Sequence, residues 1–128
     1  MFKYIKTIHS HTVAETCRFP VSLQTTIPKG TLCQFVAGKL ENSNGTKPRY
    51  LVLEDKTETD GKKYVDCIRI LPGMMLVGTP DFDTTTAKIG DLCSFATDMN
   101  ERCTMITSGG TAAEIVDISD GLLTIIIN

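Results

Sequence analysis

The fold class is decided by residues 64–77, which read YVDCIRILPGMMLV. In an extended strand alternate side chains share a face, so Val65 and Cys67 lie on one side of the first half of this stretch. Pro72-Gly73 then predicts a turn, because Pro fixes φ and Gly tolerates a positive φ, and a second apolar run follows it. The stretch therefore predicts two strands that pair around a turn.

The same pattern extends over the rest of the chain. Thr, Val and Ile are frequent, and short apolar runs end at Gly, Pro, Asn or Asp, a combination that favours strands over helices. Further strands are expected over residues 31–37 and 49–54, and Asn44-Gly45 within residues 40–47 predicts a tight turn between them. The sequence predicts an all-β domain of short antiparallel strands over residues 30–128, preceded by an extended N-terminal arm over residues 1–29.

The composition limits the kind of protein. The chain has 128 residues, of which 41% are hydrophobic and 22% charged, as in a single globular domain. A net charge of −2 provides no basic face for nucleic acid. No apolar run reaches the roughly 20 residues of a membrane-spanning helix, and no secretory signal is evident. We expect a protein made in the cytosol whose five cysteines are thiols used as small apolar residues; whether any of them pair stays open.

Two echoes in the sequence indicate an internal repeat. Residues 30–35, GTLCQF, resemble residues 90–95, GDLCSF, and residues 68–76 resemble residues 116–124. Chance similarity among short strands is the alternative explanation. The echoes predict two related antiparallel units within one domain, residues 30–77 and 90–127.

The sequence of residues 91–108 is compatible with two kinds of secondary structure. Their apolar residues fit helical spacing, and no Gly or Pro interrupts them until after Ser108. The echo of residues 30–35 at the start of this segment favours two strands and a turn instead. We expect strand, turn and strand.

Histidine and cysteine are the first candidates for chemistry. His9 and His11 with Cys17 offer zinc-binding side chains, but a structural zinc site normally has four ligands in two close pairs. An exposed polar arm explains these residues more simply. A His beside a Cys can also serve as base and nucleophile, but Cys33 and Cys93 lie in apolar strands, where a thiol is poorly activated.

Acidic and glycine-rich loops are the other candidates. Asp81 and Asp83, with Asp91, offer oxygen ligands but lack the spacing of an EF-hand loop, so a solvated acidic loop is expected. Residues 108–111, SGGT, lack the Lys of a phosphate-binding P-loop and are expected to form a turn. The sequence therefore predicts no catalytic residue, no metal and no cofactor.

The order of short motifs resembles that of a known family. Residues 28–31, PKGT, open the first strand of the domain, residues 52–55, VLED, belong to a later strand, and residues 89–91, IGD, come late in the chain. From about Val13 to Ile127, this order resembles that of the small capsid decoration (head-stabilising or cement) proteins of tailed bacteriophages.

The resemblance implies a single compact barrel-like domain, of β-tulip or SH3-like form, on the outside of a phage capsid. It implies a non-enzymatic virion protein, made in the host bacterial cytoplasm, that binds the major capsid protein, forms homotrimers and clamps neighbouring capsid subunits. Neither nucleic acid nor membrane is an expected partner. The host, the capsid geometry and the surface that faces the shell stay open.

The expected arm, residues 1–29, is polar with spaced apolar residues, as suits a segment that becomes ordered on a partner. On this interpretation, deletion of residues 1–12 leaves the domain folded and weakens partner binding. The alternative is that the arm packs as the domain's own first strand. Four residues of the arm are of the types that most often anchor interfaces and are expected to bind the partner: Phe2, Tyr4, Arg18 and Phe19.

Two other functions fit the sequence. The first is another phage or prophage structural module, such as a tail-tube, head-completion or fibre-base protein, and hexameric rings would indicate a tail or connector. The second is a small ligand-binding β-barrel or enzyme. That function requires a concave pocket with convergent polar groups.

Overall fold

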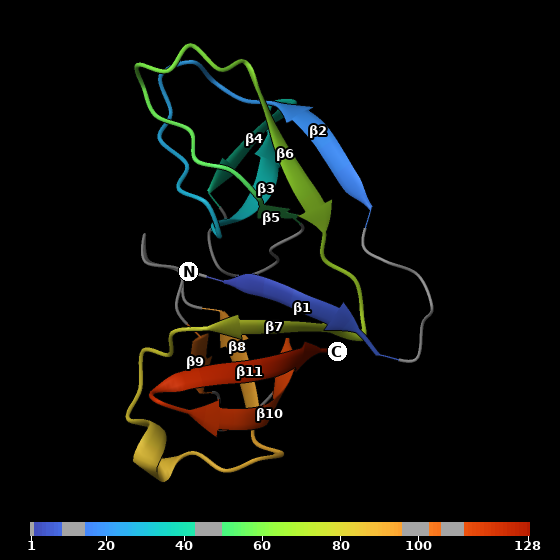
Figure 1. Ribbon diagram of the computed structural model, residues 1–128, viewed down its shortest axis with the longest axis vertical. Helices are drawn as coiled ribbons and strands as arrows, with labels where there is room; N and C mark the ends of the chain where they lie inside the picture. The colour runs from blue at the N-terminus through green and yellow to red at the C-terminus, as the bar shows by residue number, and fades with distance from the viewer. Residues whose placement is uncertain (1, 9–14, 43–49, 96–102, 106–111) are drawn as a thin grey trace.

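The computed structural model describes residues 2–8, 15–42, 50–95, 103–105 and 112–128 (Figure 1). These residues form eleven β-strands and one short 3₁₀ helix, η1. In chain order the elements are β1 (Lys3–Thr7), β2 (Thr16–Pro20), β3 (Leu32–Val36), β4 (Lys39–Asn42), β5 (Tyr50–Val52), β6 (Tyr64–Arg69), β7 (Met74–Gly78), η1 (Thr84–Thr86), β8 (Leu92–Phe95), β9 (Cys103–Met105), β10 (Ala113–Ser119) and β11 (Leu122–Ile127).

The strands form two antiparallel sheets, which lie one above the other in Figure 1. The six-stranded sheet A has the order β1-β7-β11-β10-β8-β9, and the five-stranded sheet B has the order β2-β6-β5-β3-β4. The predicted all-β class is confirmed. The predicted barrel is wrong, because a barrel needs a continuous ladder between its first and last strands. In sheet B, among the residues that the structure describes, only an isolated bridge between Val21 and Leu40 joins the two ends.

The N-terminal residues contribute an edge strand to each sheet. β1 pairs with β7 at the edge of sheet A, and β2 pairs with β6 at the edge of sheet B. Phe2 is buried in the core of sheet A. This differs from the extended arm expected over residues 1–29, because the apolar side chains of β1 and β2 find partners on strands that come much later in the chain.

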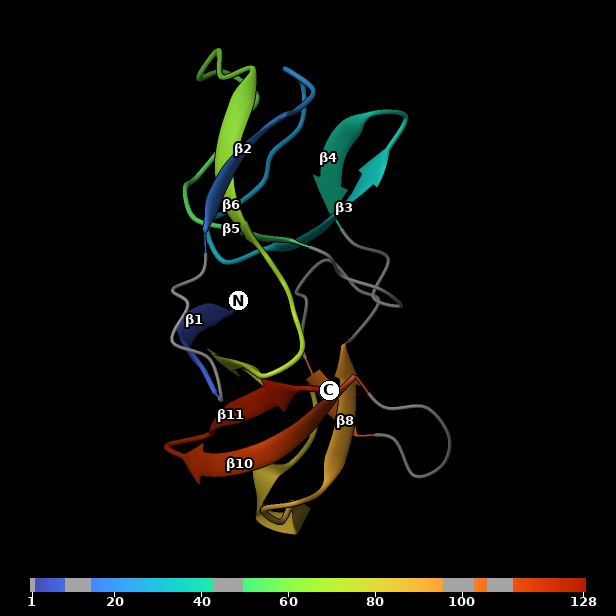
Figure 2. The same ribbon diagram turned by 90° about the vertical axis from the view of Figure 1, so that its right-hand side faces the viewer.

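Residues 64–77 form two strands, as predicted, but the predicted pairing between these strands is wrong. β6 belongs to sheet B and β7 to sheet A, and the chain crosses from one sheet to the other between them (Figure 2). Gly73 makes the turn with a φ of 87°, and its N–H donates to the carbonyl oxygen of Ile127 at 2.8 Å. The turn therefore connects two sheets and does not close a hairpin.

Sheets A and B repeat one five-strand topology. Strands β2–β6 in sheet B and β7–β11 in sheet A occur in the same spatial order: the first strand lies beside the fifth, then come the fourth, the second and the third. β1 is an additional strand on the outer side of β7. The matching units in the structure thus begin at β2 and at β7.

Backbone hydrogen bonds repeat between the two units. The N–H of Gly30 donates to the carbonyl oxygen of Val52 at 2.9 Å, and that of Gly90 donates to Ile115 at 2.8 Å. Both glycines have positive φ, 87° and 96°, a conformation that favours Gly. The echo of residues 30–35 in residues 90–95 therefore marks equivalent positions.

The second sequence echo does not mark equivalent positions. Residues 68–76 run from β6 into β7 and so change sheets, whereas residues 116–124 lie within the hairpin of β10 and β11. The strand that matches β6 in the topology is β11. The two stretches resemble each other because each has a turn between two apolar runs.

Each sheet has its own hydrophobic core. Strands β3–β6 and the connection between β2 and β3 supply the core of sheet B: Val21, Ile27, Cys33, Leu40, Val52, Val65 and Cys67. The larger core of sheet A also includes Leu32, Leu51 and Ile68 from sheet B. Burial of each such aliphatic side chain contributes about 1.5–3 kcal/mol, so these three residues hold the two sheets together.

Residues 92–95 and 103–105 form strands β8 and β9, so the strands predicted at the two ends of this segment are confirmed. They pair antiparallel, with Cys93 opposite Met105 and Phe95 opposite Cys103. The turn predicted between them lies outside the described residues.

Candidate functional site

Three aromatic side chains from three strands of sheet B pack edge to face. The ring centroid of Phe19 on β2 lies 4.9 Å from those of Phe35 on β3 and Tyr50 on β5, and the latter two are 5.3 Å apart. The rings meet at 70° to 82°, the T-shaped arrangement that aromatic pairs prefer. We call Phe19, Phe35 and Tyr50 the aromatic cluster.

Sheet A has a glycine where sheet B has Phe19. In sheet B, Phe19 on β2 stands opposite Val65 on β6. At the equivalent position of sheet A, Gly78 on β7 stands opposite Leu123 on β11. Ala113 likewise stands opposite Cys93 where Tyr50 stands opposite Cys33. Sheet A therefore lacks the counterparts of two of the three rings.

Phe2, the residue before the additional strand β1, supplies a ring beside Gly78. Phe2 lies directly against Gly78, and a Cβ added to Gly78 would overlap the Phe2 ring. Phe2 also contacts Phe95 edge to face, with 5.3 Å between ring centroids. A cross-strand aromatic ring that covers a glycine is a known way to stabilise a sheet, and here it completes the core of sheet A.

The two equivalent places differ in exposure. In sheet A, Phe2 and Phe95 are 4% and 6% exposed. In sheet B, Phe35 is 38% exposed, and Phe19 and Tyr50 are half-buried. The rings of sheet A are thus covered, whereas the aromatic cluster of sheet B is partly open to solvent, and an open aromatic surface is the kind that binds partners.

A tight hairpin holds Phe35 in place. β3 and β4 pair from Cys33 to Val36, and the two residues between the strands, Ala37 and Gly38, have φ values of 51° and 80°. Two consecutive positive φ values are those of the two-residue turn that suits antiparallel strands. Phe35 and its exposed neighbour Val36 are therefore presented by a short, ordered hairpin.

The four predicted partner-binding residues lie in two places. Phe19 belongs to the aromatic cluster, and the exposed Arg18 precedes it on β2, opposite Asp66. Phe2 and Tyr4 lie on or next to β1 in sheet A, where Phe2 is buried and Tyr4 is half-buried. Sequence reasoning missed Phe35 and Tyr50; the alternation of Cys33 and Phe35 along one strand face was the available signal.

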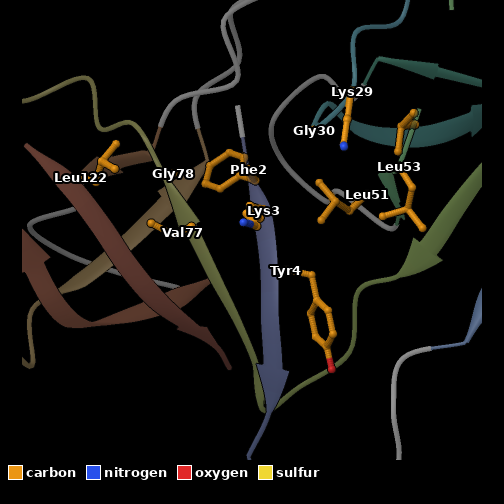
Figure 3. Close-up of a pocket in the computed structure, with 11 residues that line it drawn as sticks. Phe2, Lys3, Tyr4, Lys29, Gly30, Leu51, Leu53, Val77, Gly78 and Leu122 are labelled. Carbon is orange, nitrogen blue, oxygen red and sulfur yellow. The ribbon is translucent and has the colours of Figure 1, made fainter. Parts of the chain in front are cut away.

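A pocket of about 570 Å³ lies between the two sheets (Figure 3). Its volume falls within the roughly 300–1,000 Å³ of small-molecule sites. Figure 3 shows side chains of β1 on one side and of β5 and the residues before β3 on the other. The apolar lining residues come from both sheets: Phe2, Leu51, Val52, Leu53, Val77 and Leu122.

Polar groups at this pocket come from three residues. Lys3 and Lys29 both line it and are both exposed. Tyr4 is oriented by its hydroxyl, which lies 2.8 Å from Oγ1 of Thr7. Among the described residues, neither lysine forms an ion pair. An apolar group with an anionic end fits this combination of walls and charge.

Two of the loop carboxylates considered as metal ligands, Asp83 and Asp91, accept hydrogen bonds from the backbone. Asp83 caps η1 and accepts hydrogen bonds from N–H and Oγ1 of Thr85 at 2.9 and 2.8 Å, and the backbone bond lowers its pKa. Asp91 accepts from the N–H of Lys88 at 2.8 Å. Within the described part of the chain, no three His, Cys, Asp or Glu residues gather to hold a metal ion. His9, His11 and residues 108–111 lie outside it.

The buried thiols are poorly placed to attack a substrate that arrives from solvent. Burial raises the pKa of Cys67 to about 12. A hydrogen bond with Cys93, together with burial, raises the pKa of Cys103. Cys33 and Cys93 are fully buried in the two cores. Cys67 and Cys103 therefore resist deprotonation, and the other buried thiols are closed off from solvent, so none of them is placed to attack an external substrate.

No protein-family model matches the chain, and no curated protein matches it either. Among the described residues, no helix has the length and apolar character needed to cross a membrane.

Proposed function

We propose that this protein is a non-enzymatic bacteriophage structural protein that binds the outside of the capsid and clamps neighbouring major capsid subunits. The observation that supports this proposal is the open aromatic cluster of sheet B. The corresponding ring of sheet A, Phe95, is buried and packs against Phe2. The motif order that resembles capsid decoration proteins supports the same function.

The architecture suits a clamp. The aromatic cluster sits on paired strands, so little side-chain or backbone freedom is lost when a partner covers it. Assembly as a homotrimer would present three such clusters to the shell, and linked contacts bind more tightly than one contact does. Moderate affinity at each cluster is then sufficient for stable attachment.

Replacement of Phe35 by Ala is expected to weaken binding to expanded capsids about tenfold, a loss typical of an interface anchor. Phe35 is exposed enough for the fold to tolerate the change, which is checked by a thermal melt. Co-sedimentation with expanded capsids over a range of protein concentrations measures the binding.

The matched control is Ile89→Ala, which removes an exposed apolar side chain, 69% exposed, from the sheet A unit. This variant is expected to bind as the wild type does. Equal binding by the Phe35 and Ile89 variants would contradict a capsid-binding role for the aromatic cluster.

The number of chains per particle in solution distinguishes a capsid decoration protein from other phage structural proteins. Light scattering on a size-exclusion column is expected to give a mass near three chains. A six-chain mass would favour a ring, as in a tail tube or connector.

A second candidate function, ligand binding, is favoured by the pocket between the sheets. Its apolar walls with Lys3 and Lys29 suit a small apolar acid. Native mass spectrometry of the purified protein, before and after addition of a medium-chain carboxylate, tests it. Binding that is lost in the Lys3→Gln/Lys29→Gln variant would support this function.

A further inference from the structure

Two cysteines face each other directly across sheet B. Cys17 on β2 is the register partner of Cys67 on β6 in the antiparallel ladder. Both side chains belong to the same face of the sheet, since Cys67 is part of the sheet B core and Cys17 packs against that core. The structure thus places two thiols side by side from residues fifty positions apart in the sequence.

The register matches what a disulfide requires. Directly opposite residues in an antiparallel pair have Cα atoms about 4.5–5.5 Å apart, and disulfides span Cα distances of about 4.4–6.8 Å. Rotation of the two side chains is then enough to bring the sulfur atoms together. The backbone of β2 and β6 stays in place.

The two thiols differ in accessibility. Cys17 is half-buried on an edge strand, and the only hydrogen bond of its thiol within the described residues is a long one, 4.0 Å, to the carbonyl oxygen of Glu15. Cys67 is fully buried, and burial together with the nearby Cys17 raises its pKa. Cys17 is therefore the thiol that reacts first with a reagent from solvent. Cys67 is the thiol that then attacks the mixed disulfide formed on Cys17.

We propose that Cys17 and Cys67 form a reversible dithiol–disulfide site, whose oxidant is a small-molecule disulfide. The thiolate of Cys17 attacks one sulfur of that disulfide, which forms a mixed disulfide and releases one small thiol. Cys67 then loses its proton and attacks Sγ of Cys17, which expels the second small thiol. Two protein thiols are oxidised, the small disulfide is reduced to two thiols, and these carry away both protons.

The bond would tie an edge strand to the sheet. β2 carries Phe19, so the disulfide also fixes one member of the aromatic cluster. In a reducing compartment the pair stays as thiols, and in an oxidising one it closes. This inference does not depend on the identity of the partner that the aromatic cluster binds.

The other strand-paired cysteines provide an internal comparison. Cys93 and Cys103 are both fully buried and are out of register, because Cys103 stands opposite Phe95. Their thiols are nevertheless hydrogen-bonded to each other, but neither thiol is accessible to a small-molecule disulfide in solvent. Accessibility therefore selects Cys17 and Cys67 among the cysteines of the two ladders, because Cys17 is only half-buried.

The test is incubation of the folded protein with oxidised glutathione at pH 8, followed by alkylation, intact mass measurement and peptide mapping. We expect a species two hydrogens lighter, a linked peptide pair that contains Cys17 and Cys67, and reversal by dithiothreitol. Its thermal midpoint is expected to rise by about 10 °C, because the bond closes a long loop of the unfolded chain.

Two variants separate the steps. Cys17→Ser is expected to give neither the linked species nor the rise in thermal midpoint. Cys67→Ala is expected to accumulate one glutathione on Cys17, since the resolving thiol is gone. A linked pair that involves Cys33, Cys93 or Cys103, or wild-type protein that carries only glutathione adducts, would overturn the proposal.

Discussion

Replacement of Lys56 by Met is expected to lower the free energy of unfolding by about 3 kcal/mol. Lys56 is fully buried. Its ammonium donates to the carbonyl oxygens of Leu23 at 3.1 Å and Thr57 at 2.9 Å, and it lies 3.6 Å from a carboxylate oxygen of Asp60. Met keeps the apolar stem but leaves two carbonyl oxygens without their donor.

The effect is large because Lys56 joins two loops over the core of sheet B. Its backbone N–H and carbonyl also exchange hydrogen bonds with Ile27, at 2.9 and 2.8 Å. Loss of the ammonium therefore loosens the cover over that core. Urea denaturation measures the change, with Lys63→Met, an exposed lysine of the same connection, as the control that stays within about 0.5 kcal/mol of wild type. A Lys56→Met protein as stable as this control would contradict the account.

The contact between Phe2 and Gly78 is expected to show strong energetic coupling. Phe2→Ala alone should destabilise the protein by about 3–4 kcal/mol, since it removes a buried aromatic ring. Gly78→Ala alone should cost about 2–3 kcal/mol, because the added methyl group displaces the ring. Gly78 does not have a positive φ, so steric overlap is the reason for the loss.

In the double variant the two losses should not add. Once the Phe2 ring is absent, the methyl group at residue 78 has space, so Phe2→Ala/Gly78→Ala is expected to be about as stable as Phe2→Ala. The coupling energy from urea denaturation of the four proteins is then about 2–3 kcal/mol. Additive losses would show that the ring does not occupy this place in solution.

The fold class followed from local pattern, and the long-range pairing did not. Alternation along residues 64–70 and the turn at Pro72-Gly73 predicted strands that the structure contains. Nothing local in these residues shows whether the chain returns along the same sheet or enters another. The partners of β7 are β1 and β11, and both are far from β7 in the sequence.

The N-terminal residues also show that a local sequence pattern does not reveal long-range contacts. Phe2 and Tyr4 have the composition of a partner-binding arm, but in the structure Phe2 completes a core that Gly78 leaves open. Deletion of residues 1–12 is therefore expected to destabilise the domain, contrary to what an extended arm predicts. A glycine in an apolar strand, at residue 78, was the available sign that another side chain approaches there.

The candidate site was predicted in part. Phe19 and Arg18 were singled out by residue type, and Phe19 lies in the aromatic cluster. Phe35 and Tyr50 join it across strand pairs that only the sheet order reveals. The difference between a covered cluster and an open one depends on exposure, which no sequence pattern shows.

Oxidative footprinting on expanded capsids tests the central claim most directly. Hydroxyl radicals modify exposed aromatic side chains, and peptide mapping compares the free protein with the capsid-bound protein. We predict that modification of Phe35 and Tyr50 falls several-fold on binding, while that of Tyr64, which is 50% exposed and outside the aromatic cluster, changes little. Unchanged modification of Phe35 and Tyr50 in capsid-bound protein would contradict the claim that the aromatic cluster is the binding surface.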